Sequence, residues 1–182
     1  GKHPRPAGIG LPKVEVHALA STRAGTYFAG TAQDVFRSTD NGASWQPAAT
    51  GPLQQNVTAL LVDDRDWLYA GTERGGIYVS QDEGHLWAQM SGEGVARPPR
   101  GFKKWLPFLF DGPLPKTTVR YLAAHPQGGR RVLFAGTDDG VYRSLDLGST
   151  WQPSNFNMPE LDWKTGQAKT VVRSLVAVQR GA

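Results

Sequence analysis

Alternating apolar and polar residues recur in four short stretches of this chain. The stretches cover residues 14–21, 57–64, 119–126 and 172–179. A two-residue period is typical of strands, in which successive side chains point to opposite faces. No helical period of useful length occurs within the repeats that these stretches begin, so the pattern predicts an all-β chain.

The first three stretches each lead into a second, more specific pattern. An aromatic residue precedes Ala-Gly-Thr. A polar turn, an apolar pair and Ser-x-Asp-x-Gly-x-x-Trp follow, over residues 27–45, 68–87 and 133–151. Each unit reads as four short antiparallel strands, and a repeat of roughly 40 residues built this way is typical of a β-propeller blade.

We therefore expect an N-terminal arm or linker and about three complete blades, followed by one strand of the next. The expected boundaries are 1–13 for the arm, 14–50, 57–90 and 119–153 for the blades, and 171–179 for the further strand. Propellers close with about four blades or more, so the chain is predicted to be part of a larger propeller, as a fragment or by association. Uncovered strand edges at either end would favour pairing with another chain.

The Ser-x-Asp-x-Gly-x-x-Trp segment must reverse the chain between the third and fourth strands. Glycine accepts the positive φ of such a turn, aspartate and serine can hydrogen-bond its backbone, and tryptophan packs beside it. The predicted structural residues are Ser38, Asp40, Gly42, Trp45, Ser80, Asp82, Gly84, Trp87, Ser144, Asp146, Gly148 and Trp151.

These segments resemble the Asp-box family, also called bacterial neuraminidase repeats. Ser44 and Thr150 fill the hydroxyl position of that pattern, whereas Leu86 departs from it in the second copy. The resemblance implies that the box is a hairpin on the outer rim, away from the ligand face. It also implies similarity to sortilin-type and photosystem II assembly factor propellers, to sialidases and to xyloglucan-cleaving enzymes, and an extracytoplasmic location.

Composition narrows the chemistry without identifying a ligand. The 182 residues contain no cysteine, which excludes disulfides and thiolate sites. The 20 Lys+Arg against 16 Asp+Glu give a net charge of only +4, which is weak evidence for nucleic-acid binding. The four histidines are scattered, so we predict no metal site and no cofactor, and we expect His17 and His125 to be packed or hydrogen-bonded.

An insertion over residues 91–116 separates the second and third blades on the presumed ligand face. It carries the residues predicted to bind a partner: Arg97, Arg100, Lys103, Lys104, Trp105 and Phe108. Adjoining basic and aromatic side chains suit a protein surface or, through residues 97–110, an anionic membrane surface. The alternative is a loop that covers the propeller face with its cations solvated.

Two functional hypotheses follow. The preferred one is a non-catalytic binding or assembly module whose loop face contacts a protein partner. The alternative is a fragment of a xyloglucanase-like or sialidase-like glycoside hydrolase, which leaves carbohydrate open as a ligand. A hydrolase needs two carboxylates across a cleft. Three turns should look toward the ligand face, those with Gln33 and Asp34, with Glu73 and Arg74, and with Asp138 and Asp139, but no catalytic residue is predicted.

Overall fold

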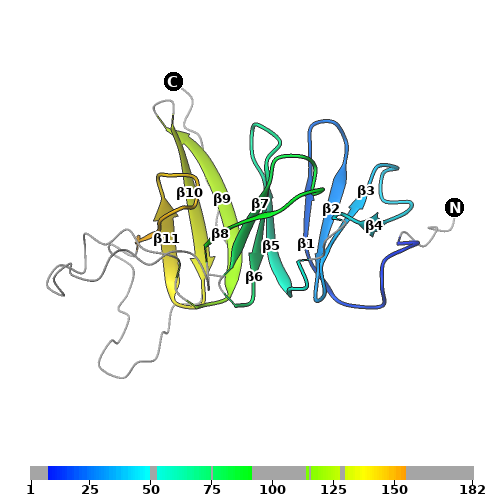
Figure 1. Cartoon of the computed structure of the whole chain (residues 1–182), viewed down its shortest axis with the longest axis horizontal. Coiled ribbons are helices and arrows are strands. Elements are labelled where there is room, and N and C mark those ends of the chain that lie inside the picture. The colour runs from blue at the N-terminus through cyan, green and yellow to red at the C-terminus, as the bar shows by residue number, and fades with distance from the viewer. Residues whose placement is uncertain are drawn as a thin grey trace, which may run out of the picture.

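The computed structural model describes residues 8–49, 53–74, 76–91, 114, 116–127 and 130–154. Over these residues the chain forms three four-stranded antiparallel sheets and no helix (Figure 1). The predicted further strand at 171–179 and most of the 91–116 insertion lie outside the described residues.

Each sheet contains four strands that are consecutive in sequence and in space. The first sheet consists of β1 (Val16–Ser21), β2 (Tyr27–Thr31), β3 (Val35–Ser38) and β4 (Gln46–Pro47). The second consists of β5 (Val57–Val62), β6 (Leu68–Thr72), β7 (Ile77–Ser80) and β8 (Ala88–Ser91). The third consists of β9 (Val119–Gln127), β10 (Arg130–Thr137), β11 (Gly140–Ser144) and β12 (Gln152–Pro153).

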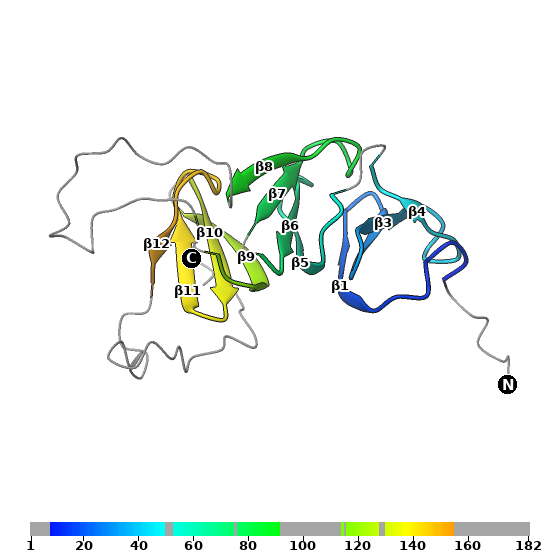
Figure 2. The ribbon, with the colours of Figure 1, turned by 60° about the horizontal axis from the view of Figure 1, so that its bottom comes forward.

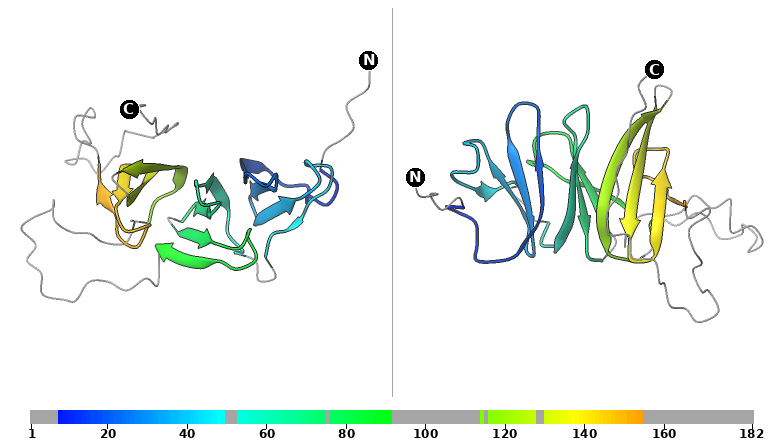
Figure 3. Two further views of the ribbon diagram at one scale, coloured as in Figure 1. Left: turned by 90° about the horizontal axis from the view of Figure 1, so that it is seen from above. Right: turned by 180° about the vertical axis from the view of Figure 1, so that it is seen from behind.

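The three sheets follow one another face to face, as blades do. Figures 2 and 3 show them in succession along an arc, with the first strand of each sheet on the same side. β5 contacts β1 and β2 of the sheet before it, and β9 contacts β5 and β6 in the same way. The first strands β1, β5 and β9 are therefore the inner strands, and β4, β8 and β12 the outer ones.

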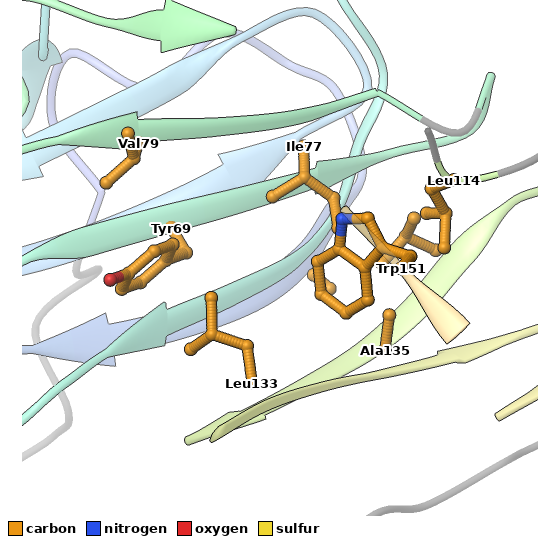
Figure 4. Close-up of a cluster of buried hydrophobic side chains, with 9 residues drawn as sticks. Tyr69, Ile77, Val79, Leu114, Leu133, Ala135 and Trp151 are labelled. Atoms are coloured by element: carbon orange, nitrogen blue, oxygen red, sulfur yellow. The ribbon is translucent and has the colours of Figure 1, made fainter. Parts of the chain in front are cut away.

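Apolar side chains fill the spaces between neighbouring sheets. Between the first and second sheets the buried cluster comprises Phe28, Val35, Ala48, Val57, Leu68 and Ala70. Between the second and third it comprises Ala59, Tyr69, Ile77, Val79, Leu114, Val119, Leu133, Ala135 and Trp151, most of which Figure 4 shows. Because each sheet buries one face against its neighbour, the core is a series of interfaces between blades.

The glycine of Ala-Gly-Thr permits this close approach. A Cβ added to Gly30 would lie 2.8 Å from Cγ1 of Val57, and one added to Gly71 would lie 2.5 Å from Cγ1 of Val119. Val57 and Val119 each begin the inner strand of the following sheet and are fully buried. Glycine is therefore required on β2 and β6 because a valine from the next sheet occupies the space of a side chain.

The threonine of the same motif closes the turn between the second and third strands. Thr31 Oγ1 donates to the carbonyl of Asp34 at 2.9 Å, Thr72 Oγ1 to that of Gly76 at 3.0 Å, and Thr137 Oγ1 to that of Gly140 at 2.9 Å. Each hydroxyl also accepts a backbone N–H from its turn. The Asp34 and Gly76 carbonyls also accept the backbone N–H of the threonine, so each buried hydroxyl adds a donor to the carbonyl and supplies an acceptor for a turn N–H.

The turns at residues 38–45, 80–87 and 144–151, here named the Ser-Asp-Gly-Trp turns, share one hydrogen-bond pattern. In the first, Ser38 Oγ donates to Asp40 Oδ1 at 2.7 Å and accepts from the Gly42 N–H at 2.9 Å. Asp40 Oδ1 also accepts from the Ser44 N–H at 2.8 Å, and Oδ2 from the Ser44 hydroxyl at 2.5 Å. The carboxylate thus stands at the centre of the turn.

The second turn lacks two side-chain hydrogen bonds that the first and third turns form: one from a hydroxyl to the aspartate, and one from the tryptophan to the glycine carbonyl. Leu86 replaces the hydroxyl residue, so only its N–H donates to Asp82, at 2.9 Å. Trp151 Nε1 donates to the Gly148 carbonyl at 2.9 Å, whereas the buried Trp87 Nε1 has no hydrogen-bond partner among the described residues. The glycines of all three turns have positive φ, and so do Asn41, Glu83 and Leu147 just before them, which sequence reasoning missed.

A buried ion pair also joins the second and third sheets. Arg131 Nη1 lies 2.8 Å from Asp63 Oδ2, with side chains 6% and 0% exposed, and its Nη2 contacts Asp64. The Tyr69 hydroxyl donates to Asp63 Oδ2 at 3.3 Å, and burial raises the pKa of Tyr69. Breaking one partner of such a pair would leave a buried charge uncompensated.

Replacement of Gly30 by alanine should strain the interface between the first two sheets. Its Cβ would meet Val57 at 2.8 Å, so we expect the free energy of unfolding to fall by about 1–3 kcal/mol in urea denaturation. Val57→Ala should be less destabilising in the Gly30→Ala background than in the wild type, because it relieves the clash. Strict additivity in this double-mutant cycle would contradict the contact.

Protonation of Asp40 should disrupt the first Ser-Asp-Gly-Trp turn. Hydrogen bonds from Ser44 lower the pKa of Asp40 from 3.8 to about 2. A carboxyl with a depressed folded-state pKa stabilises the protein above its unfolded pKa of 3.8 and loses this effect as the pH falls through about 2. An NMR titration should report the low pKa in the wild type and a higher one in Ser44→Ala. The same value in both would contradict the assigned cause.

Candidate functional site

Each inner strand carries a β-bulge at its second residue. Val16 pairs with Thr31 but Ala18 with Gly30, which leaves His17 unopposed. The same shift leaves Thr58 unopposed in β5 and Arg120 unopposed in β9. A bulge bends the strand and changes the direction of the extra side chain, so these three residues occupy equivalent special positions.

The three bulged residues line one cavity of about 310 Å³. The inner strands run side by side, and this brings positions far apart in sequence to the same end of the sheets. The rest of the lining comes from that end of the second and third sheets: Asn56, Glu73, Thr118 and Tyr121. The cavity is therefore a composite of all three blades, and its lining is predominantly polar.

Thr58 links the second and third sheets at the cavity wall. Its Oγ1 lies 2.6 Å from the carbonyl oxygen of Val119 and 3.2 Å from that of Gly71. The single hydroxyl proton can donate to one of these carbonyls at a time. Val119 is the residue that packs over Gly71, immediately before the bulge at Arg120. The hydroxyl therefore fixes the two inner strands where the cavity forms.

Arg120 is paired with an acid at the rim. Its Nε donates to Asp138 Oδ1 at 2.6 Å and its Nη2 to Oδ2 at 3.0 Å. Donation of these hydrogen bonds to Asp138 raises the pKa of Arg120, and their acceptance from Arg120 lowers the pKa of Asp138. This bidentate pair holds the guanidinium in a fixed orientation and neutralises its charge locally.

Glu73 is held by an amide. Asn56 Nδ2 donates to Glu73 Oε2 at 3.1 Å, and among the described residues no group donates to the second carboxylate oxygen. Because a carboxylate only accepts, this bond fixes the amide nitrogen toward Glu73. The buried Asn56 Oδ1 then has no hydrogen-bond partner in the part of the chain that the structure describes.

Sequence reasoning identified part of this site. The turns with Glu73 and Asp138 lie at the cavity, whereas the turn with Gln33 and Asp34 contributes no residue to its described lining. That this end of the sheets is the ligand face stays a prediction. The prediction for His17 was wrong: its side chain is exposed, because the bulge turns it toward the cavity. The repeated Val-x pattern at each inner strand start was the available signal for the bulged positions.

Of the other predicted residues, one group is not described by the structure and the other lies away from the cavity. Arg97, Arg100, Lys103, Lys104, Trp105 and Phe108 are outside the described residues. The Ser-Asp-Gly-Trp turns connect third and fourth strands, at the opposite end of the sheets from the cavity. Asp82 and Trp87 contribute to a separate, more open depression beside the exposed Leu86.

Two features are absent from the described part of the chain. The residues of ranges 8–49, 53–74, 76–91, 114, 116–127 and 130–154 contain no group of three or more His, Asp or Glu placed to hold a metal ion. These ranges also contain no helix long and apolar enough to cross a membrane.

The sequence matches no family model and no curated protein. Several solved structures have a similar fold. The extracellular domain of a hybrid two-component system from B. thetaiotaomicron is 19% identical with a TM-score of 0.56, and the match covers 80% of this chain and 17% of that one. An ancestral GH74 enzyme is 17% identical with a TM-score of 0.55, over 76% of this chain and 18% of the enzyme.

YCF48 bound to D1 peptide is 16% identical with a TM-score of 0.52, over 76% of this chain and 40% of YCF48. This chain therefore spans well under half the length of these proteins. Identities this low show the fold alone. These structural similarities and the three stacked four-stranded sheets together show that the chain is part of a β-propeller.

Proposed function

We propose that this chain is a non-catalytic β-propeller binding module whose partner, a protein, contacts the end of the sheets that bears the cavity. The observation that carries the proposal is the alignment of three bulges, which turn His17, Thr58 and Arg120 into one polar cavity. Bulges that redirect side chains at one place in every repeat are typical of functional positions.

The charges of the site favour binding over hydrolysis. A glycoside hydrolase needs a carboxylic acid whose pKa is raised so that it can protonate the leaving group. The pKa of Asp138 is lowered instead, because Arg120 donates to it. The alternative of a glycoside hydrolase fragment rests on the fold shared with GH74 enzymes.

Two structural neighbours add support for the type of partner and the location. YCF48 has been solved with a D1 peptide, and another neighbour is an extracellular domain. We extend both points to this chain as proposals, namely a peptide segment as the bound element and an extracytoplasmic location.

The insertion at 91–116 belongs to the same proposal. β8 ends at Ser91 and β9 begins at Val119, so the connection leaves and returns at the cavity end. Leu114 is buried between the second and third sheets and ties the end of the connection to the core. Arg97, Arg100, Lys103, Lys104, Trp105 and Phe108 would then extend the contact surface beyond the cavity.

Selection of displayed peptides on the immobilised chain tests the function. Peptides selected on the wild type should bind His17→Ala/Arg120→Ala about tenfold more weakly in a calorimetric titration, since central interface residues contribute most of the affinity. Arg23→Ala is the matched control, because Arg23 lies in the turn between β1 and β2 at the opposite end. Equal binding by all variants, or reducing sugar released from xyloglucan by the wild type, would reject the proposal.

The role of the insertion has its own test. Trp105→Ala/Phe108→Ala should weaken the same peptides while leaving the circular dichroism spectrum and thermal midpoint unchanged, because aromatic anchors dominate contact surfaces. Unchanged affinity would remove the insertion from the contact surface and leave the cavity as the site.

A further inference from the structure

We infer that the cavity accepts a basic side chain, a lysine ammonium or an arginine guanidinium presented by the partner. This inference rests on the proposed function and adds the chemistry of the bound element. It concerns a local property, since the chain as a whole carries +4.

The charge balance at the cavity is negative. Arg120 is neutralised by its two bonds to Asp138, at 2.6 and 3.0 Å. In the described part of the chain, the Glu73 carboxylate accepts a side-chain hydrogen bond only from the neutral Asn56 amide, at 3.1 Å. When Asp138 is counted with its partner Arg120, the described carboxylates and guanidinium at the cavity sum to one negative charge, carried by Glu73.

An anionic ligand fits this arrangement poorly. It would approach Arg120 where Asp138 already occupies two of the guanidinium donors. It would also face the unneutralised carboxylate of Glu73, which is close enough to contribute to the raised pKa of Arg120. Like charges in contact lower affinity, so the same groups that repel an anion attract a cation.

The uncharged lining complements a cation as well. Tyr121 offers a partly exposed ring on the cavity wall, and a ring face attracts ammonium and guanidinium groups. Within the described ranges the buried Asn56 Oδ1 has no donor, a condition that a hydrogen-bond donor beside it would relieve. The volume of about 310 Å³ accommodates the end of one long side chain.

The test uses pentapeptides of sequence Gly-Gly-Xaa-Gly-Gly, acetylated and amidated, with lysine, arginine, norleucine or glutamate in the centre. Binding is followed by NMR through the Asn56 side-chain amide and the Arg120 Nε–H. The lysine and arginine peptides should shift both signals with saturable curves. Norleucine, which has the aliphatic stem without the charge, should shift neither.

The decisive variant is Glu73→Gln, which removes the charge and keeps the shape. It should weaken the lysine peptide about threefold, the size expected of a partly exposed charge pair. Glu83→Gln is the matched control, since Glu83 lies in the second Ser-Asp-Gly-Trp turn and pairs with Arg37 at 3.7 Å. Added salt should weaken the lysine peptide in the wild type more than in Glu73→Gln.

Three outcomes overturn the inference: tighter binding of the glutamate peptide, equal lysine affinity in Glu73→Gln and wild type, or no shift with any peptide. The displayed-peptide selection separates this failure from failure of the proposed function. If the selected peptides contain no basic residue but their binding still depends on His17 and Arg120, the proposed binding face stands and the inference of a basic side chain is wrong.

Discussion

The contact between a glycine of one blade and a valine of the next is the constraint on which the rest of the structure depends. Val57 and Val119 fill the space that a Cβ on Gly30 or Gly71 would need. This approach sets the spacing between sheets, and the buried clusters form at that spacing. Since the residue after each valine is the bulged one, the same contact also sets the position of the cavity lining.

The turns at the two ends of each blade differ in their hydrogen bonding and in what their side chains face. At one end the Ser-Asp-Gly-Trp turns satisfy their backbone groups internally, around Asp40, Asp82 and Asp146. Desolvation raises the pKa of Asp146, but hydrogen bonds from Thr150 and Ser144 outweigh it and lower the net value. At the other end Thr31, Thr72 and Thr137 close short turns and leave the side chains beside them free to face the cavity.

The sequence predicted the blades well because period and turn chemistry are local. The four strands of each unit, their order and the all-β class follow from alternation and the Ser-Asp-Gly-Trp spacing. The cavity was less predictable. A bulge is a register shift between two strands, so the direction of His17 depends on its pairing partners rather than on its neighbours in sequence. The pairing of Arg120 with Asp138 likewise requires the fold, since 18 residues separate them.

Comparison of the repeats with one another separates residues of the scaffold from residues of the site. Val57 and Val119, like the Ala-Gly-Thr glycines they cover, recur because the interface between blades admits no other shape. The next position differs in every blade, being His17, Thr58 and Arg120, although the backbone bulge is the same. A constant backbone with a variable side chain is the arrangement expected of a recognition surface, because the fold tolerates change there while the chemistry of the cavity alters.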